Sequence, residues 1–185
     1  MEDELERLLR TVRAEDATRS RARVGALRDL AVEDATIDGI VHELADDARP
    51  VRLLVHGVVR TGTLVAAWSG GVVLAAHGIE LLVRTDAIDV VLSPDGCRIG
   101  GDEHRPPERS WAALLHDHLE PDHLLALTVG GAELHGRMVS IGRAVVVIDT
   151  DERARCYVRT DAIDTVVLGT GTLGSSALDA GRSAL

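Results

Sequence analysis

The order of apolar and polar residues divides the chain into two stretches that follow the same plan. The first stretch opens with apolar residues three or four positions apart, the spacing of one helix face: Ile37, Ile40, Val41 and Leu44. Five short runs rich in Val, Leu, Ile and Ala follow, and such runs predict β-strands. They are Val51–His56, Thr63–Trp68, Val72–Ala76, Ile79–Arg84 and Ile88–Leu92. Glycines between several of the runs predict turns.

The second stretch repeats this plan so closely that it indicates an internal duplication. The seven residues Val83–Asp89 recur unchanged as Val158–Asp164, 75 positions later, and the matches upstream of them are 74 positions apart. A second helix is expected from Trp111, Leu114, Leu115 and Leu119. The second set of strand-like runs is Leu124–Val129, Glu133–Ile141, Ala144–Asp149, Arg155–Arg159 and Ile163–Leu168. The sequence therefore predicts two copies of one unit, at 33–92 and 109–168.

A helix and five bent strands in about 60 residues suggest a small closed barrel, because closure leaves few strand edges exposed. Residues suited to cap the two helices are Asp34, Thr36 and Ser110. Around the two units we expect a helical N-terminal arm at 1–32, a linker at 93–108 and a disordered tail at 169–185. The predicted fold is mainly β, with two tandem five-stranded small barrels of the SH3-like kind, each preceded by a short helix.

Charge narrows the range of partners. The chain holds 20 basic residues, all of them Arg, against 30 acidic ones, and its net charge is −10. This balance disfavours nucleic acid as a partner, although a local Arg patch is left open. The acidic N-terminus lacks the basic start and apolar core of a signal peptide, and no apolar run reaches the ~20 residues needed to cross a bilayer. We therefore expect a soluble, cytoplasmic protein without membrane association.

The order and spacing of the elements resemble the Sm-like family, which includes the bacterial RNA chaperone Hfq. The motifs that carry the similarity are Ile40–Leu44, Pro50–Leu53, Gly57, Gly62 and Ala87-Ile88, and the similarity recurs from Leu114 to Ile163. The layout also looks like a group of actinobacterial tandem-barrel proteins. The resemblance implies a non-enzymatic protein that forms oligomeric rings, in which the fourth strand of one barrel pairs with the fifth strand of the next.

The residues that bind RNA in Hfq-like proteins are not matched here. Where those proteins have a Gln and an aromatic residue before the third strand, this chain has Gly70-Gly71 and Arg143-Ala144. Where they have a Lys-His pair before the last turn, it has Thr85-Asp86 and Thr160-Asp161. Stacking of a base on an aromatic side chain is worth ~1–3 kcal/mol, and an Asp repels phosphate. The resemblance therefore implies the fold but not the family's RNA site.

Eight arginines are candidates for nucleic-acid contacts: Arg19, Arg21, Arg23, Arg28, Arg84, Arg137, Arg143 and Arg159. The first four are the best local patch, because no acidic residue lies among them. Part of the repeated heptad could form a duplicated ligand site: Arg84, Thr85, Asp86, Arg159, Thr160 and Asp161. The same residue types are typical of a tight turn between the last two strands, and we favour the turn.

No catalytic or metal-binding motif is complete in the sequence. His116-Asp117-His118 looks like a metal-binding cluster, but residues two apart on a helix point about 200° apart and cannot share one ion. His118 aligns with the apolar Leu44, which favours a histidine at the edge of the core. We find no nucleophile paired with a base, and no P-loop, zinc-protease or calcium-loop pattern. We therefore expect no enzymatic activity, metal or cofactor.

These observations favour a non-catalytic interaction or assembly module that acts through protein contacts at strand edges and through the helical arm. The acidic units and the absence of catalytic motifs in the sequence support this hypothesis. Either a protein partner or self-association is expected. The alternative is an RNA- or DNA-binding regulator that uses a local Arg patch.

Overall fold

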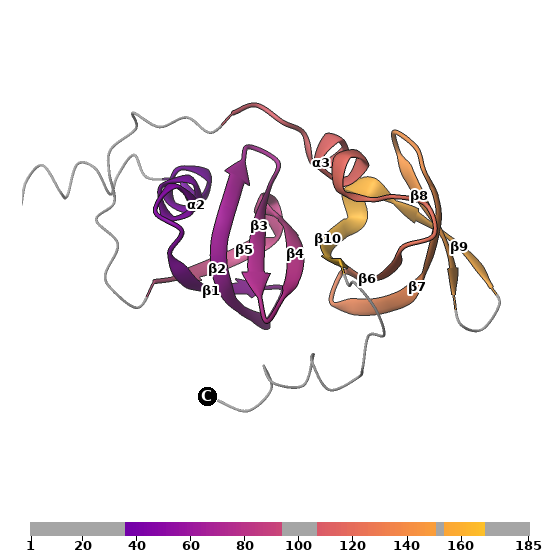
Figure 1. Cartoon of the computed structure of the whole chain (residues 1–185), viewed down its shortest axis with the longest axis horizontal. Helices are drawn as coiled ribbons and strands as arrows, with labels where there is room; N and C mark the ends of the chain where they lie inside the picture. Colours follow the sequence, from indigo (N-terminus) through magenta and orange to yellow (C-terminus); the bar gives the residue numbers. More distant parts are fainter. Residues whose placement is uncertain (1–35, 94–106, 151–153, 169–185) are drawn as a thin grey trace, which may run out of the picture. The chain divides into compact units, whose positions relative to one another are not determined.

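The computed structural model describes residues 36–93, 107–150 and 154–168, which all lie in one compact unit (Figure 1). These residues form a mainly β fold, in which ten strands make one antiparallel sheet accompanied by two α-helices. The expected helical arm at 1–32, nearly all of the linker at 93–108, and the tail at 169–185 lie outside the described residues.

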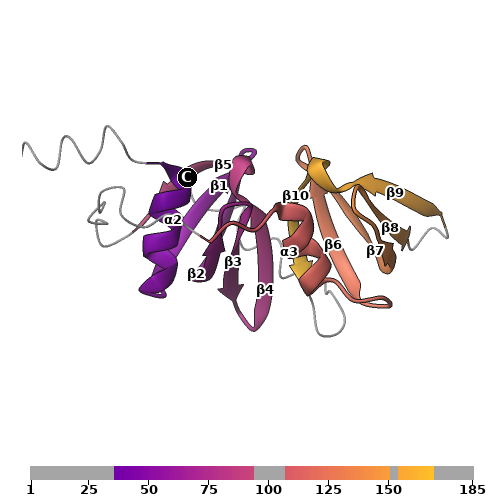
Figure 2. The same cartoon turned by 90° about the horizontal axis from the view of Figure 1, so that it is seen from above.

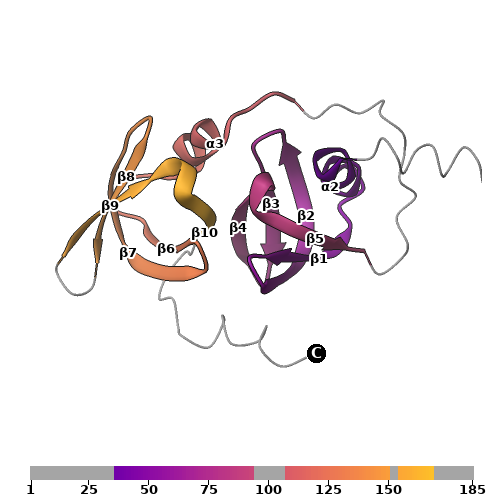
Figure 3. The same ribbon diagram turned by 180° about the vertical axis from the view of Figure 1, so that it is seen from behind.

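The first repeat begins with helix α2 (Ile37–Asp46), which buries Val41, Leu44 and Ala45. Its strands are β1 (Pro50–Val55), β2 (Val58–Trp68), β3 (Gly71–Ala76), β4 (Ile79–Arg84) and β5 (Ile88–Leu92), and the 3₁₀ turn η1 (Thr85–Ala87) joins the last two. β5 returns to pair with β1 (Figure 3). The predicted strand bounds agree to within one residue, except that β2 starts five residues earlier than predicted, because its first half pairs with β1 across a tight turn.

The second repeat has the same elements at equivalent positions. It begins with helix α3 (Trp111–His118). Its strands are β6 (Leu124–Val129), β7 (Ala132–Ile141), β8 (Val145–Thr150), β9 (Arg155–Arg159) and β10 (Ile163–Leu168), with the 3₁₀ turn η2 (Thr160–Ala162) before β10. A register shift between Leu64 and Ala66 in β2 has its counterpart between Met138 and Ser140 in β7. Such bulges bend a strand, so both repeats curve at the same point.

The sheet is open, and this departs from the expected pair of closed barrels with few exposed edges. Its strand order is β5-β1-β2-β3-β4-β10-β6-β7-β8-β9. The first repeat does not close on itself through β4 and β5, because β4 pairs with β10 of the second repeat (Figure 2). Within the described residues, β5 pairs with β1 alone and β9 with β8 alone.

The two helices begin where the sequence predicts. The hydroxyl of Thr36 accepts a hydrogen bond from the N–H of Gly39 at 3.1 Å, and the hydroxyl of Ser110 accepts one from Ala113 at 3.3 Å. Each hydroxyl satisfies one of the N–H groups that a helix start leaves without a partner. The capping residues Thr36 and Ser110 are thus confirmed.

Each repeat has an apolar core that includes residues of the other repeat. The core around α2 contains Val41, Leu53, Leu64 and Leu74 together with Ala126 and Val167 of the second repeat. The core around α3 contains Leu115, Leu125, Ile148 and Ile163 together with Val73 and Leu82 of the first. Because the cores share residues in this way, the two repeats pack as one body.

Candidate interaction interface

The two repeats of this chain bind each other through the pairing of β4 with β10, here called the repeat junction. The register sets Leu82 opposite Val166 and Val83 opposite Thr165. All four residues are buried. β4 is the fourth strand of its repeat and β10 is the fifth strand of its own, so the junction joins two different strand types.

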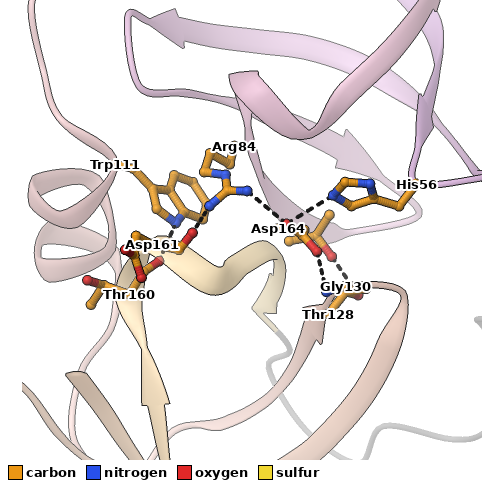
Figure 4. Close-up of polar contacts among 9 residues, drawn as sticks. His56, Arg84, Trp111, Thr128, Gly130, Thr160, Asp161 and Asp164 are labelled. Carbon is orange, nitrogen blue, oxygen red and sulfur yellow. Dashed lines mark hydrogen bonds and ion pairs between the residues drawn. The ribbon is translucent and has the colours of Figure 1, made fainter. Parts of the chain in front are cut away.

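Asp164 is a buried carboxylate whose partners come from both repeats (Figure 4). Its Oδ1 lies 3.0 Å from Nη2 of Arg84 and 3.2 Å from Nε2 of His56, both in the first repeat. Its Oδ2 accepts a hydrogen bond of 2.6 Å from the N–H of Gly130 in its own repeat. Arg84 also donates from Nη1 to the carbonyl oxygen of Asp161. A buried charge requires such partners, and here they connect the two repeats.

Local backbone geometry positions these groups. The pairing of β10 with β6 shifts register between Ile163 and Thr165, which makes Asp164 the extra residue of a β-bulge. A bulge redirects a side chain out of the regular alternation. His56 and Gly57 form the two-residue turn between β1 and β2 with φ of +46° and +79°, and this turn carries the His56 ring toward Asp164.

A second polar contact crosses the repeat junction. Nη2 of Arg60 in β2 lies 3.4 Å from the hydroxyl oxygen of Thr128, which in turn accepts a hydrogen bond of 2.8 Å from the hydroxyl of Thr165. Burial lowers the pKa of the Arg60 guanidinium, and the negative charge of Glu133 opposes that shift. Arginine nevertheless stays protonated at neutral pH.

The start of α3 packs against the β2–β3 turn of the first repeat. Nε1 of Trp111 donates to the carbonyl oxygen of Thr160 at 3.1 Å. A Cβ atom on Gly70 would lie 2.4 Å from the backbone nitrogen of Trp111, and one on Gly71 would lie 2.8 Å from its ring. Both positions therefore require glycine because the start of α3 lies too close for a side chain, and not because the backbone has an unusual angle.

The strands at the two ends of the sheet, β5 and β9, are here called the open edges, and they expose apolar side chains that the repeat junction buries. Val90 and Leu92 of β5 are 39% and 50% exposed, whereas their equivalents in β10, Thr165 and Val167, are 1% and 6% exposed. Tyr157 of β9 is 72% exposed, whereas its equivalent in β4, Leu82, is 1% exposed. Equivalent positions in the fourth and fifth strands are thus buried where the two repeats meet and exposed at the ends of the sheet.

The charged residues of the heptad differ in the same way. Arg159, the equivalent of Arg84, is exposed and binds the neighbouring Asp161 through Nε at 3.0 Å. That hydrogen bond lowers the pKa of the Asp161 carboxyl and raises the pKa of Arg159. Asp89, the equivalent of Asp164, is exposed in β5. The open edges therefore carry the equivalents of both members of the ion pair in the repeat junction, because Arg159 corresponds to Arg84 and Asp89 to Asp164.

The four candidate arginines that the structure describes lie on different elements. Arg19, Arg21, Arg23 and Arg28 lie outside the described residues. Arg84 lies in the repeat junction and Arg159 at an open edge, while Arg137 donates to the carbonyl oxygen of Asp122 at 2.7 Å. Arg143 is exposed, and its carbonyl oxygen accepts from the hydroxyl of Thr160 at 3.4 Å.

The repeated Thr-Asp-Ala segments form the 3₁₀ turns η1 and η2 between the last two strands of each repeat. Thr85 and Thr160 are buried, whereas Asp86 and Asp161 are exposed. Neither turn has a side-chain hydrogen bond to its first N–H groups. The backbone conformation rather than side-chain capping therefore defines these turns.

Of the histidine cluster in α3, His118 is partly buried, whereas His116 and Asp117 are exposed. Nδ1 of His118 lies 2.9 Å from the carbonyl oxygen of Leu114, and its ring meets the Trp68 ring edge-on with centroids 6.1 Å apart. In the part of the chain that the structure describes, no three His, Cys, Asp or Glu residues are placed to hold a metal ion. None of the described helices combines the length and apolar character required to span a membrane.

No protein-family model matches the chain, and a search of curated proteins finds no match.

Sequence reasoning missed three residues of the repeat junction and one of the open edges. They are His56, Arg60, Asp164 and Tyr157. Identical heptads predict identical environments, so nothing in the sequence distinguishes Asp164 from Asp89. Tyr157 did carry a signal, because it is one of three aromatic residues in the chain and lies in the last-but-one strand of its unit.

Proposed function

We propose that this chain is a non-catalytic interaction and assembly module, built from two tandem Sm-like small barrels that bind protein through their open edges. The observation that carries the proposal is the exposure of Val90, Leu92 and Tyr157 along the two strands at the ends of the sheet. An edge strand presents unpaired N–H and C=O groups to another chain, and adjacent apolar side chains add burial to that pairing. Neither strand contains proline, a residue that discourages edge pairing.

The small-barrel part of the proposal is supported by the path of β2. Its first half pairs with β1 and its second half pairs with β3, with the bulge near the change of partner. All five strands of the first repeat contribute residues to one core, which agrees with the Sm-like resemblance. The second repeat follows the same path through β7.

Nucleic-acid binding receives less support from the described residues. Arg84 is bound to the buried Asp164, and Arg159 and Arg155 form ion pairs with Asp161 and Asp149. An arginine that already pairs with a carboxylate must break that pair before it can bind phosphate. Fluorescence anisotropy with labelled U-rich and A-rich RNA tests the alternative, since sub-micromolar binding that weakens with salt would favour it.

Site-specific photocrosslinking tests whether the open edges bind protein. A benzoylphenylalanine residue replaces Tyr157 or Leu92 in separate variants. Glu80, an exposed residue of β4 in the middle of the sheet, is replaced as the control. Illumination of expressing cells should give covalent protein adducts from the two edge positions and few from position 80. Equal, background-level adducts at all three positions would contradict the proposed function.

A further inference from the structure

We infer that the edge of β9 binds an extended segment of another protein, and that Ala144 prevents a second copy of this chain from binding there. The inference rests on the proposed function and names the kind of partner that one of the two open edges takes. It departs from the rings that the Sm-like resemblance implies, because it excludes the contact that would build them.

In the repeat junction, the second repeat contacts the first in two ways. Strand β10 pairs with the edge of β4, and the start of helix α3 packs against the turn between β2 and β3. The helix contact requires glycine, because a Cβ atom on Gly70 would lie 2.4 Å from the backbone nitrogen of Trp111 and 2.6 Å from the carbonyl oxygen of Arg109. A further unit of this fold that paired with β9 would need the same space beside the turn between β7 and β8.

Ala144 occupies the position of Gly70 in the turn between β7 and β8, and the backbone makes the same hydrogen bond at both places. The carbonyl oxygen of Gly70 accepts from the N–H of Thr85 at 3.4 Å, and that of Ala144 accepts from the N–H of Thr160 at 3.0 Å. The registers of the strands that follow agree with this alignment, which lies one position later than the sequence predicts. The methyl group of Ala144 therefore points into the space that the start of α3 takes beside Gly70.

A side chain of the second copy cannot relieve this clash. The helix that would approach is α2, which begins at Ile37 as α3 begins at Trp111. Ile37 is smaller than Trp111, and this difference offsets the change from Gly71 to Val145. The atoms that would meet the methyl group of Ala144 belong to the backbone, and no exchange of side chains moves them. Overpacking of this kind should weaken the contact at least about tenfold.

Ala144 obstructs an approaching helix but leaves the edge of β9 open to a strand. Among the described residues β9 pairs with β8 alone, so its outer N–H and C=O groups are available to an added strand. Tyr157, which is 72% exposed, lies at this edge opposite Val147 of β8. Tyrosine is one of the residue types enriched where interfaces concentrate their binding energy. A partner that brings a strand without a helix at its start therefore fits this edge.

The charges beside Tyr157 indicate that the segment is uncharged where it meets the tyrosine. Arg155 binds Asp149 through Nε at 2.8 Å. Arg159 binds Asp161 through Nε at 3.0 Å. Each pair neutralises itself, so these residues offer no unpaired charge to a segment of either sign. Aliphatic and β-branched side chains, which pack well against an aromatic ring on a neighbouring strand, are favoured instead.

Sedimentation velocity of the full chain tests the exclusion of a second copy. The wild type should show no association that Tyr157→Arg removes. Ala144→Gly, alone or together with Val145→Gly, should associate at least about tenfold more tightly than the wild type, and adding Tyr157→Arg should abolish the gain. Ala132→Gly, at an exposed position of β7, is the matched control and should behave as the wild type. Wild-type association that Tyr157→Arg removes, or no gain in either glycine variant, would overturn the exclusion.

A model peptide tests the extended partner. The probe is a fluorescein-labelled peptide of alternating Thr and Val with one Lys at each end, and fluorescence anisotropy follows its binding to the full chain. The wild type should bind it with a Kd below about 1 mM. Tyr157→Arg should weaken the binding at least about tenfold. A peptide with Pro at its centre should not bind, because it lacks an N–H group that the added strand needs. Equal binding of the Pro peptide, or no binding of the probe to the wild type, would overturn the extended partner.

These results are separable from that of the photocrosslinking experiment. If position 157 crosslinks to protein while the wild type associates with itself through β9, the inference fails and the proposed function stands. Background-level crosslinking at both edges would overturn the proposed function, and the inferred partner with it.

Discussion

At the scale of single residues, Asp164 and Asp89 show how one amino acid in one repeated motif acquires two roles. Asp164 is buried and bound to Arg84, His56 and the N–H of Gly130, whereas Asp89 is exposed at an open edge. The difference comes from what lies beside the strand rather than from the motif itself. Asp164 therefore contributes to folding of the single chain, and Asp89 does not.

Replacing Asp164 with Asn should destabilise the fold strongly. The change leaves the guanidinium of Arg84 in a largely buried place without its counter-charge, and loss of one member of such a pair costs about 2–4 kcal/mol. Urea unfolding of dilute protein, followed by circular dichroism, measures the loss. Asp89→Asn is the matched control, and it should change the free energy of unfolding by less than about 0.5 kcal/mol. Equal effects of the two changes would contradict the special role of Asp164.

The folding stability of the chain should depend on pH through the ionisation of Asp38. Burial in the first turn of α2, together with the negative charge of Asp86, raises the pKa of the Asp38 carboxyl above its ordinary value. The folded chain therefore holds this proton more tightly than the unfolded chain does, so the contribution of Asp38 to stability falls as pH rises from the ordinary value through the raised one. The ionised Asp38 consequently costs stability at neutral pH.

Asp38→Asn should accordingly raise the melting temperature slightly at pH 7, and the advantage should vanish at a pH below the ordinary pKa of an aspartate, about 3.9. Thermal unfolding followed by circular dichroism at both pH values measures this. Asp86→Asn should shift stability in the same direction, since it removes the repelling charge. A lower melting temperature for Asp38→Asn at pH 7 would mean that attraction to the start of α2 outweighs burial and repulsion.

At the scale of elements, the sequence predicted the helices, the strands and their succession along the chain within each repeat. Seven of the ten predicted strands have the observed bounds, as Ile79–Arg84 does, or differ at one end by a single residue, as the observed Ala132–Ile141 does. Alternation and turn residues are local signals, so they locate a strand well. They do not say which strand lies beside it. The pairing of β4 with β10, and hence the open sheet and the burial of Asp164, could not be predicted for that reason.

The position of helix α3 in the second repeat depends on Gly70 in the first repeat. A Cβ atom there would meet the backbone of Arg109 and Trp111. Gly70→Ala should therefore displace the start of α3 and cost about 1–3 kcal/mol, as overpacking does. Urea unfolding measures the cost, and a shift in Trp111 fluorescence reports the displacement. Gly142→Ala is the control, because its Cβ would lie 3.5 Å from the carbonyl oxygen of Val145 and should be tolerated. An unchanged Gly70→Ala protein would mean that α3 can move at no cost.

At the scale of the whole molecule, the shared cores should make both repeats unfold together. Leu53 lies wholly within the first core, and Trp111 lies in the second. In a Trp68→Phe chain, Trp111 alone reports the second repeat by fluorescence, while circular dichroism reports both repeats. Leu53→Ala should cost about 2–5 kcal/mol and shift both signals by the same amount, because loss of the first core removes the partners of Val167 and Ala126 in the second repeat. Coincident transitions are the mark of one cooperative unit. A Trp111 transition that stayed in place while the circular dichroism curve became biphasic would mean that each repeat folds alone. The pairing of β4 with β10 would then be a docking contact between two independent units.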